Sequence, residues 1–178
     1  MSSAPIAPEA LRTFAAYNRW MNQKIFHLCA LMSDAQRRQD RGAFFRSIHG
    51  TLNHLLFADL AWLGRFKEGT PRVSRPGADL HPDFNDLWRA RRVLDAEIEG
   101  WAATVDAAWL ARPFRYKSLF GGAELEQPAW LLVLHMFNHQ THHRGQIATL
   151  LTQAGLDLGV TDLAAMPLAS DAAPGDGE

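Results

Sequence analysis

Residues 128–155 read PAWLLVLHMFNHQTHHRGQIATLLTQAG, an uninterrupted helical pattern. The apolar positions of this stretch recur at three- and four-residue spacing, which is typical of the buried face of an α-helix. They include Leu131, Leu132, Leu134, Met136, Ile147, Leu150 and Leu151. Pro128 suits the start of a helix, and Gly155 suits the position just after its end. We therefore predict a long helix from Pro128 to Gln153 or Ala154.

Three earlier segments show the same rhythm. We predict a first helix of roughly 24 residues from the spacing of its apolar side chains, a second that begins after a Ser47 N-cap, and a third that opens at Pro82 and Asp83. The apolar stripes run from Leu11 to Met32 in the first helix, from Ile48 to Phe66 in the second and from Phe84 to Val105 in the third. Four long helices with core stripes and no parallel-sheet pattern predict an all-α protein, a four-helix bundle.

The connections between these helices set the expected topology. Residues 113–127 hold two short runs around Gly121-Gly122, which predicts a small hairpin or ordered loop before the last long helix. Residues 67–82, fully extended, span roughly 45 Å and could cross the whole bundle. We therefore favour an up-down-down-up bundle over the simple alternating one. Residues 1–169 are expected to form one domain, and the polar tail 170–178 to be disordered.

Composition excludes several classes of function. The 178 residues carry a net charge of −1, with no basic excess of the kind that nucleic-acid binding requires. Cys29 is the single cysteine, so neither an intrachain disulfide nor a cysteine-based zinc site can form. No apolar run is long enough to span a membrane, and the first residues do not resemble a signal peptide. We expect a cytoplasmic protein with no nucleic-acid or membrane partner; a homodimer is compatible with the sequence.

The histidines of the last helix point to a metal site. His135, His139 and His143 stand four residues apart and form one stripe, with His142 on the neighbouring edge. Two imidazoles at i and i+4 can bind one ion from the same side. The alternative is that these are surface or hydrogen-bonded core histidines. Four in nine residues favour the metal site, because several neutral imidazoles in one core would each need a partner.

A third ligand is expected from the second helix. His54 lies among small residues, which would let this helix approach the last one closely, and His49 is its competitor nearer the helix start. We predict His54, His139 and His143 as metal ligands, with His135 or His142 next to these ligands but not bound to the metal. Three imidazoles leave open positions, which is the pattern of a reactive site. Imidazole suits zinc, nickel, copper and iron, and the spacing does not choose among them. We expect zinc or nickel first, with iron, manganese or copper as alternatives.

Three pieces of the chain carry a family resemblance. They are YNRWMN (Tyr17–Asn22), GTLNHLLFADLAWL (Gly50–Leu63) and HMFNHQTHHRGQIATLLTQAG (His135–Gly155). With the later LDLGVTDL (Leu156–Leu163), they resemble the DinB/YfiT-like family of metalloenzymes. The resemblance implies a four-helix bundle that holds a divalent metal through His54, His139 and His143. It also implies chemistry on a small molecule, with a low-molecular-weight thiol as a candidate cosubstrate.

Polar residues near the expected site complete the prediction. Asn18, with its neighbours Tyr17 and Trp20, is a candidate for the metal pocket, as is Gln146; Arg144 is a candidate for binding an anionic substrate. For Asn18, and for Asp59 and Arg91 at other apolar positions, the alternative is a hydrogen bond that only fixes helix register. We expect a metal-dependent thiol transferase, isomerase or hydrolase. The alternatives are a non-catalytic metal- or ligand-binding bundle, and a purely structural protein that binds no metal.

Overall fold

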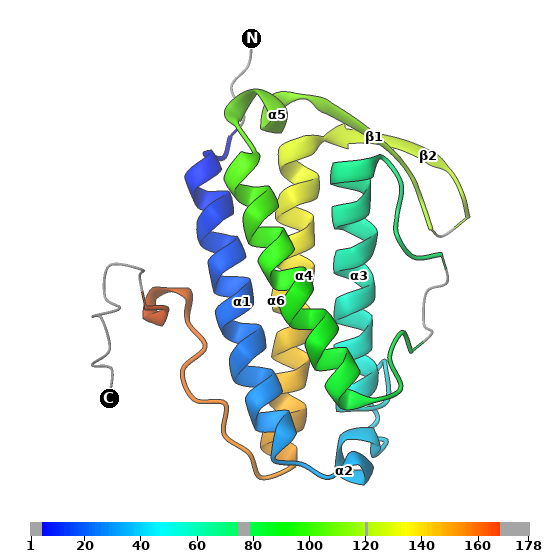
Figure 1. Ribbon diagram of the computed structural model, residues 1–178, viewed down its shortest axis with the longest axis vertical. Coiled ribbons are helices and arrows are strands. Elements are labelled where there is room, and N and C mark those ends of the chain that lie inside the picture. Colours follow the sequence, from blue (N-terminus) through cyan, green and yellow to red (C-terminus); the bar gives the residue numbers. More distant parts are fainter. Residues whose placement is uncertain (1–4, 75–78, 120, 168–178) are drawn as a thin grey trace.

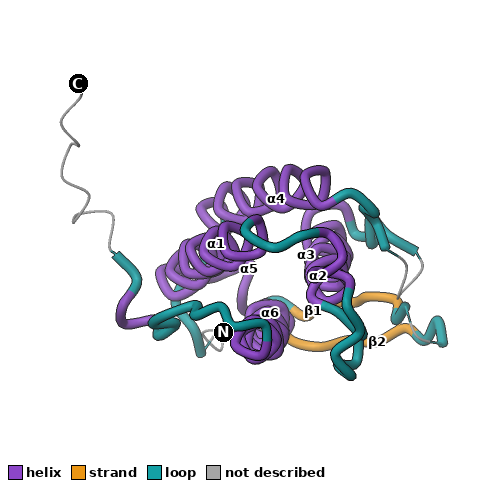
Figure 2. Tube along the Cα trace, turned by 90° about the horizontal axis from the view of Figure 1, so that it is seen from below, coloured by secondary structure: helices purple, strands orange, loops and turns teal. Residues whose placement is uncertain are grey.

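The computed structural model describes residues 5–74, 79–119 and 121–167. Four long helices lie side by side in it (Figure 1): α1 (Pro8–Ala30), α3 (Ile48–Glu68), α4 (Phe84–Thr104) and α6 (Ala129–Gln153). Helix α1 packs against α4 and α6, and α3 packs against the same two helices, so the four surround one core (Figure 2). In Figure 1, α1 and α6 run downwards whereas α3 and α4 run upwards.

Shorter elements connect the long helices. Helix α2 (Asp34–Arg38) precedes α3, α5 (Ala107–Ala111) follows α4, and a 3-10 turn, η1 (Leu163–Ala165), lies beyond α6. The hairpin predicted for residues 113–127 is present as antiparallel strands β1 (Pro113–Lys117) and β2 (Glu124–Pro128). The sequence did not predict α2 or α5, because each is a single short turn of helix. The predicted disordered tail, residues 170–178, lies outside the described residues.

The helix boundaries follow local capping chemistry. The Ser47 hydroxyl oxygen accepts a hydrogen bond from the Gly50 N–H at 3.0 Å, as its predicted N-cap role requires. The Asp83 carboxylate accepts from the two N–H groups of Asn85 and Asp86 at the start of α4. Gly155 follows α6 with a φ of 79°, a conformation that costs glycine little. These caps define where each long helix begins or ends.

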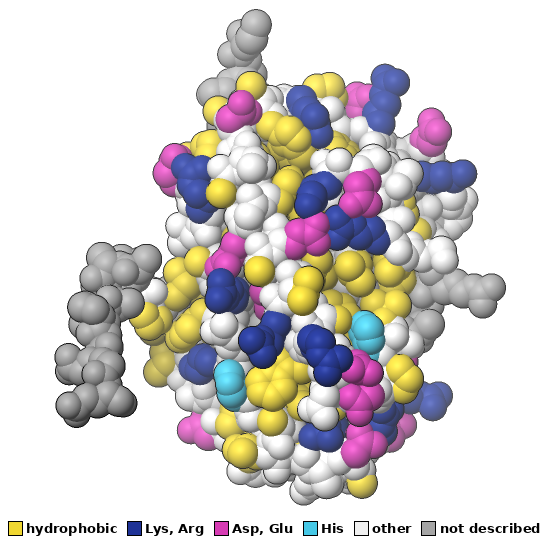
Figure 3. All heavy atoms as spheres, in the orientation of Figure 1, with side chains coloured by type: hydrophobic (Ala, Val, Ile, Leu, Met, Phe, Trp, Pro, Cys, Tyr) yellow, Lys and Arg dark blue, Asp and Glu magenta, His cyan; other side chains and the backbone are white. Residues whose placement is uncertain are grey.

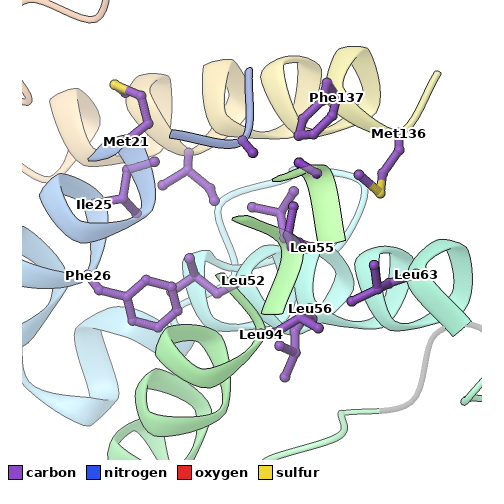
Figure 4. Close-up of a cluster of buried hydrophobic side chains, with 14 of the residues drawn as sticks. Met21, Ile25, Phe26, Leu52, Leu55, Leu56, Leu63, Leu94, Met136 and Phe137 are labelled. Carbon is purple, nitrogen blue, oxygen red and sulfur yellow. The ribbon is translucent and has the colours of Figure 1, made fainter. Parts of the chain in front are cut away.

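Apolar side chains of all four long helices meet between them. Figure 4 shows this cluster, in which α1 and α3 supply most of the labelled residues, and α4 and α6 the remainder. The labelled residues are buried: Met21, Ile25, Phe26, Leu52, Leu55, Leu56, Leu63, Leu94, Met136 and Phe137. Because these stripes must stay in contact, the faces that α3 and α6 turn toward each other are determined.

A charged network crosses this apolar core. The guanidinium of Arg91 is buried and lies 2.7 Å from an Asp59 oxygen and 2.9 Å from an Asp95 oxygen. The Asn18 and Asn22 amides donate to Asp95 at 3.3 and 2.9 Å. Breaking a buried pair of this kind leaves an uncompensated charge, so the network opposes any sliding of α1, α3 and α4 past one another.

The visible surface mixes charges of both signs. Over α1 and α4, basic and acidic side chains alternate in Figure 3. Arg19 pairs with Glu99 across the two helices, and Arg89 pairs with Asp86 along α4, each at 2.6 Å. Among the described helices, none has the apolar length that a bilayer crossing requires.

Candidate metal centre

The packing of α3 against α6 brings three histidines together. His139 and His143 stand one turn apart on α6, and His54 faces them from α3. One ring nitrogen from each of the three lies within 4.8 Å of the other two. Within the described part of the chain, this is the one group of three or more His, Cys, Asp or Glu side chains arranged to hold a metal ion.

Two of the three distances between the ring nitrogens match those expected around a metal ion. His139 Nε2 lies 3.3 Å from His54 Nε2 and 3.1 Å from His143 Nε2. Tetrahedral zinc, with bonds of about 2.0–2.1 Å, holds its ligand nitrogens about 3.3 Å apart. The Nδ1 atom of His139 is buried without a hydrogen-bond partner among the described residues. The donor set therefore fits a divalent ion bound through the Nε2 atoms.

Burial keeps these imidazoles in the form that binds metals. Desolvation, with a smaller contribution from His143, lowers the pKa of His54 to about 4. Desolvation and the neighbouring histidines lower the pKa of His139 to about 3. The pKa of His143 is also lowered, mainly by burial. All three rings are therefore neutral at pH 7, and only a neutral imidazole offers a lone pair to a metal.

Gln146 orients one of the three rings. Its amide oxygen lies 2.7 Å from His143 Nδ1 and accepts the hydrogen of that nitrogen. With the proton on Nδ1, the lone pair of His143 is on Nε2, which points to His139. The Gln146 amide nitrogen lies 3.3 Å from His142 Nε2. Metal-binding histidines commonly have such an acceptor behind them. The structure thus places Gln146 beside the cluster, as its spacing from His143 predicts.

Phe45 forms a wall of the cluster that sequence reasoning missed. Its ring stacks on the His54 ring, with centroids 3.9 Å apart and planes inclined by 19°. It also meets the His143 ring edge-on at 5.5 Å. Phe45 precedes α3 in an irregular loop, so no periodic pattern marked it. Its nearness to the Ser47 cap was the one available signal.

A cavity of about 710 Å³ reaches His54 from the α2–α3 loop. Its aromatic wall consists of Phe44, Phe45 and Phe57, and its charged residues include Arg38 and Arg46. A space of this size accommodates a small molecule next to His54, the one candidate ligand among the described residues that line it.

Two residues predicted near the site belong to the core network instead. The Asn18 oxygen accepts a hydrogen bond from Arg144, and the Asn18 amide donates to Asp95. Arg144 is buried, also donates to the Thr141 hydroxyl, and lies 5.3 Å from the Tyr17 ring. Burial lowers its pKa to about 10. Arg144, the predicted candidate for binding an anionic substrate, thus directs donors into the core and is not among the described residues that line the cavity beside His54.

The remaining candidates lie around the periphery. The Tyr17 hydroxyl donates to the Thr161 carbonyl at 2.5 Å, and the Trp20 ring packs beside Tyr17 at 5.9 Å. The two rings therefore pack together, and the Tyr17 hydrogen bond links α1 to the segment after α6. His135 lies 6.1 Å from the His139 ring and packs on Trp62. This distance places His135 next to the cluster but outside it.

The competing residues have other partners. His49 Nε2 lies 3.1 Å from the His81 carbonyl oxygen, so His49 ties the start of α3 to the loop before α4. Cys29 is buried, and desolvation raises the pKa of its thiol to about 12. It is therefore no thiolate at neutral pH, in agreement with its prediction as a core residue.

Together, the fold and the cluster define a helical protein with three histidines on two facing helices, placed where they could hold a metal ion. The chain matches the DinB family over residues 5–173 and belongs to that family. It is similar to Protein DinB of Bacillus subtilis (strain 168), with 25% identity over 154 residues, 82% of this chain and 87% of the relative.

A solved structure supports the same fold. The crystal structure of a DinB-like protein from Bacillus cereus ATCC 10987 superimposes with a TM-score of 0.57 at 19% identity. The match covers 79% of this chain and 90% of the other. At this identity the likeness concerns the fold alone.

Proposed function

We propose that this protein is a cytoplasmic, divalent-metal-dependent enzyme that acts on a small molecule. Its fold is proposed to be an up-down-down-up four-helix bundle in a single domain over residues 1–169. The observation that carries the proposal is the convergence of three neutral Nε2 atoms from His54, His139 and His143. Imidazole binds zinc, nickel, copper and iron, and we propose zinc or nickel as the ion.

The chain's own residues supply the ligands, their orientation and the substrate space. Gln146 holds the His143 tautomer, and Phe45 stacks on the His54 ring. A divalent ion, when bound, supplies a Lewis acid and lowers the pKa of a thiol or water molecule that it binds. Because Cys29 is buried and protonated, a reactive sulfur would come from a low-molecular-weight thiol cosubstrate. Transferase, isomerase and hydrolase chemistry all fit this arrangement.

Metal analysis of tag-free protein tests the ligand set. We expect about one divalent ion per chain in the wild type, since three imidazoles hold one ion. His54→Ala, His139→Ala and His143→Ala should each weaken metal binding. The loss should exceed the roughly 10- to 100-fold that is typical when a residue hydrogen-bonded to a metal ligand is removed. His81→Ala, outside the cluster, is the matched control and should retain the metal. Retention of the ion by His54→Ala together with its loss in His49→Ala would show that the third ligand is His49.

A cobalt-substituted sample separates an enzyme from a closed binding site. Addition of 2-mercaptoethanol near neutral pH should produce a sulfur-to-cobalt absorption band, because three ligands leave a position for the thiolate. His139→Ala should abolish this band. A spectrum that changes neither with thiols nor with small anions would favour the alternative, a non-catalytic metal-binding bundle.

A further inference from the structure

The loop between α2 and α3 forms a tight turn at the mouth of the cavity. The Arg46 N–H donates to the Ala43 carbonyl at 2.7 Å, and the Arg41 N–H donates to the Arg46 carbonyl at 2.8 Å. This turn places Phe45 against His54 and leaves Arg46 among the residues that line the cavity. One side of the cavity is therefore defined by two consecutive residues of one turn.

Arg46 adopts an unfavourable backbone conformation. Its φ is 64°, and within the described ranges it is the one non-glycine residue with a positive φ. The left-handed region costs energy for any side chain with a Cβ, and asparagine tolerates it better than arginine. Backbone strain of this kind is concentrated at sites that bind ligands. If the turn alone determined the residue at this position, one that tolerates the left-handed conformation, such as asparagine, would be expected instead of arginine.

Of the two arginines that line the cavity, Arg38 is paired within the described part of the chain and Arg46 is not. Arg38 pairs with Asp34 at 2.9 Å and lies 4.0 Å from Asp79. A carboxylate oxygen of Asp40 accepts the Gly42 N–H at 3.0 Å. The Arg46 guanidinium has neither a hydrogen bond nor an ion pair to any residue that the structure describes. It is the cation of this cavity left available to a ligand.

The metal ligands add no negative charge to this balance. All three are imidazoles, so a bound divalent ion would keep its full positive charge at one end of the cavity. Phe44, Phe45 and Phe57 supply apolar surface along the same cavity. An organic anion with an apolar body matches these features, since arginine pairs in two-pronged geometry with carboxylate and phosphate groups.

We propose that this cavity binds a small organic acid, a carboxylate or phosphate on an apolar body, and that Arg46 pairs with its acidic group. This inference rests on the proposed function and names the class of substrate for the same site. The apolar body would lie along the phenylalanine wall, with the rest of the molecule directed to His54. Arg46 takes the role in anion binding that Arg144, held in the core, does not fill.

Calorimetric titration with benzoate, phenyl phosphate and the neutral benzyl alcohol tests the proposal, in zinc-loaded and in metal-free protein. We expect at least one of the two anions to bind the zinc-loaded wild type and benzyl alcohol to bind at least tenfold more weakly than that anion. Arg46→Asn should weaken binding of that anion by about tenfold or more, the effect of losing a charge-assisted hydrogen bond. Arg46→Lys, which keeps the charge but loses the two-pronged geometry, should weaken binding of that anion less than Arg46→Asn does. Arg12→Gln, an exposed arginine on α1, is the control and should bind as the wild type does.

Thermal unfolding of the same variants separates binding from structure. Arg46→Asn should melt at the same temperature as the wild type or higher, because asparagine tolerates the left-handed conformation. Equal affinity of Arg46→Asn and the wild type for both anions would overturn the proposal. Binding of benzyl alcohol as tight as that of the anions, or binding of none of the three probes, would also overturn it.

The metal content distinguishes this failure from failure of the proposed function. A wild type that holds no metal, yet binds an anion through Arg46, would refute the metalloenzyme and leave the anion site standing. A wild type that holds its metal but binds anions independently of Arg46 would refute the anion site and leave the metalloenzyme proposal standing.

Discussion

The Nε2 lone pair of His143 is free for a metal because the Nδ1 hydrogen already has an acceptor in Gln146. The tautomer of an imidazole depends on such a partner. The cluster is thus more than three side chains at the right spacing: for His143, an outer partner determines which ring nitrogen carries the lone pair. Phe45 contacts His54 differently, by stacking on the face of its ring.

At the residue scale, we predict that Phe45→Leu weakens zinc binding by roughly tenfold, as the loss of an outer partner does. Leucine keeps the apolar character but removes the flat face that holds the His54 ring. Phe45→Tyr, which retains the ring, should bind zinc nearly as the wild type does. Competition with a chromophoric chelator measures both dissociation constants.

The neighbouring phenylalanine provides the control for this prediction. Phe44 is 84% exposed and touches the Phe45 ring edge-on at 4.8 Å. Phe44→Leu should leave zinc affinity unchanged. Equal losses in Phe44→Leu and Phe45→Leu would indicate a general disturbance of the loop instead of a specific stack.

At the element scale, the start of α3 is positioned by a close contact between backbones. A Cβ added to Gly50 would lie 2.3 Å from the Phe45 carbonyl oxygen, far inside any normal contact. The loop therefore lies directly on the first turn of the helix, and the absence of a side chain at Gly50 allows it. His54 stands one turn further along the same helix, so the contact links the loop to a metal ligand.

We predict that Gly50→Ala destabilises the protein by about 1–3 kcal/mol, the usual cost of overpacking. It should also weaken zinc binding, because the displaced loop carries Phe45 away from His54. Urea unfolding and chelator competition measure the two effects.

Gly100 in α4 is the matched control. A Cβ at that position would meet no atom within 4 Å. Gly100→Ala should therefore stabilise the protein by about 0.5–1 kcal/mol, since glycine inside a helix costs that much relative to alanine. A Gly50→Ala variant as stable as Gly100→Ala would contradict the close contact.

At the scale of the whole molecule, an ion-pair network joins α4 to the end of α3 and the loop beyond it. Glu97 on α4 lies 2.8 Å from Arg72 and 2.5 Å from Lys67. The hydrogen bond from Arg72, with the smaller effects of Lys67, lowers the pKa of the Glu97 carboxyl to about 2. A carboxyl whose pKa falls on folding stabilises the native state above its unfolded pKa, and this contribution is lost as the pH falls toward the folded value.

We therefore predict that Glu97→Gln lowers the free energy of unfolding at pH 7 by about 1 kcal/mol, a figure reduced for solvent screening at this partly exposed site. The difference from the wild type should shrink as the pH falls from about 5 toward 2, where the wild-type carboxyl becomes protonated. Urea unfolding at successive pH values measures it.

Glu126 in the hairpin serves as the comparison for Glu97. Its partner Arg115 is 86% exposed, so the pair has little effect on the fold. Glu126→Gln should change stability by less than about 0.5 kcal/mol at every pH. A constant difference between Glu97→Gln and the wild type from pH 7 to pH 3 would contradict the assignment of the effect to the carboxylate.

Local rules were sufficient for the long helices and the hairpin of this protein. Helix periodicity, the Ser47 and Asp83 caps and the glycine pair at 121–122 predicted the long helices and the hairpin, because each depends on residues close in sequence. The four-residue spacing of His139 and His143 likewise put two imidazoles on one face of a helix before any tertiary contact was known.

Tertiary structure alone determined the rest, because it depends on residues far apart in the chain. Whether Arg144 faced a substrate or the core was settled by Asn18, 126 positions earlier, which accepts its hydrogen bond in the buried network. The Phe45 stack required a loop without periodicity to rest on Gly50. The approach of His54 to His139, 85 positions apart, was inferred from small residues, but only the packing of α3 against α6 sets it at 3.3 Å. Sequence spacing determines which face of a helix a side chain occupies, whereas the packing of several helices at once determines what that face meets.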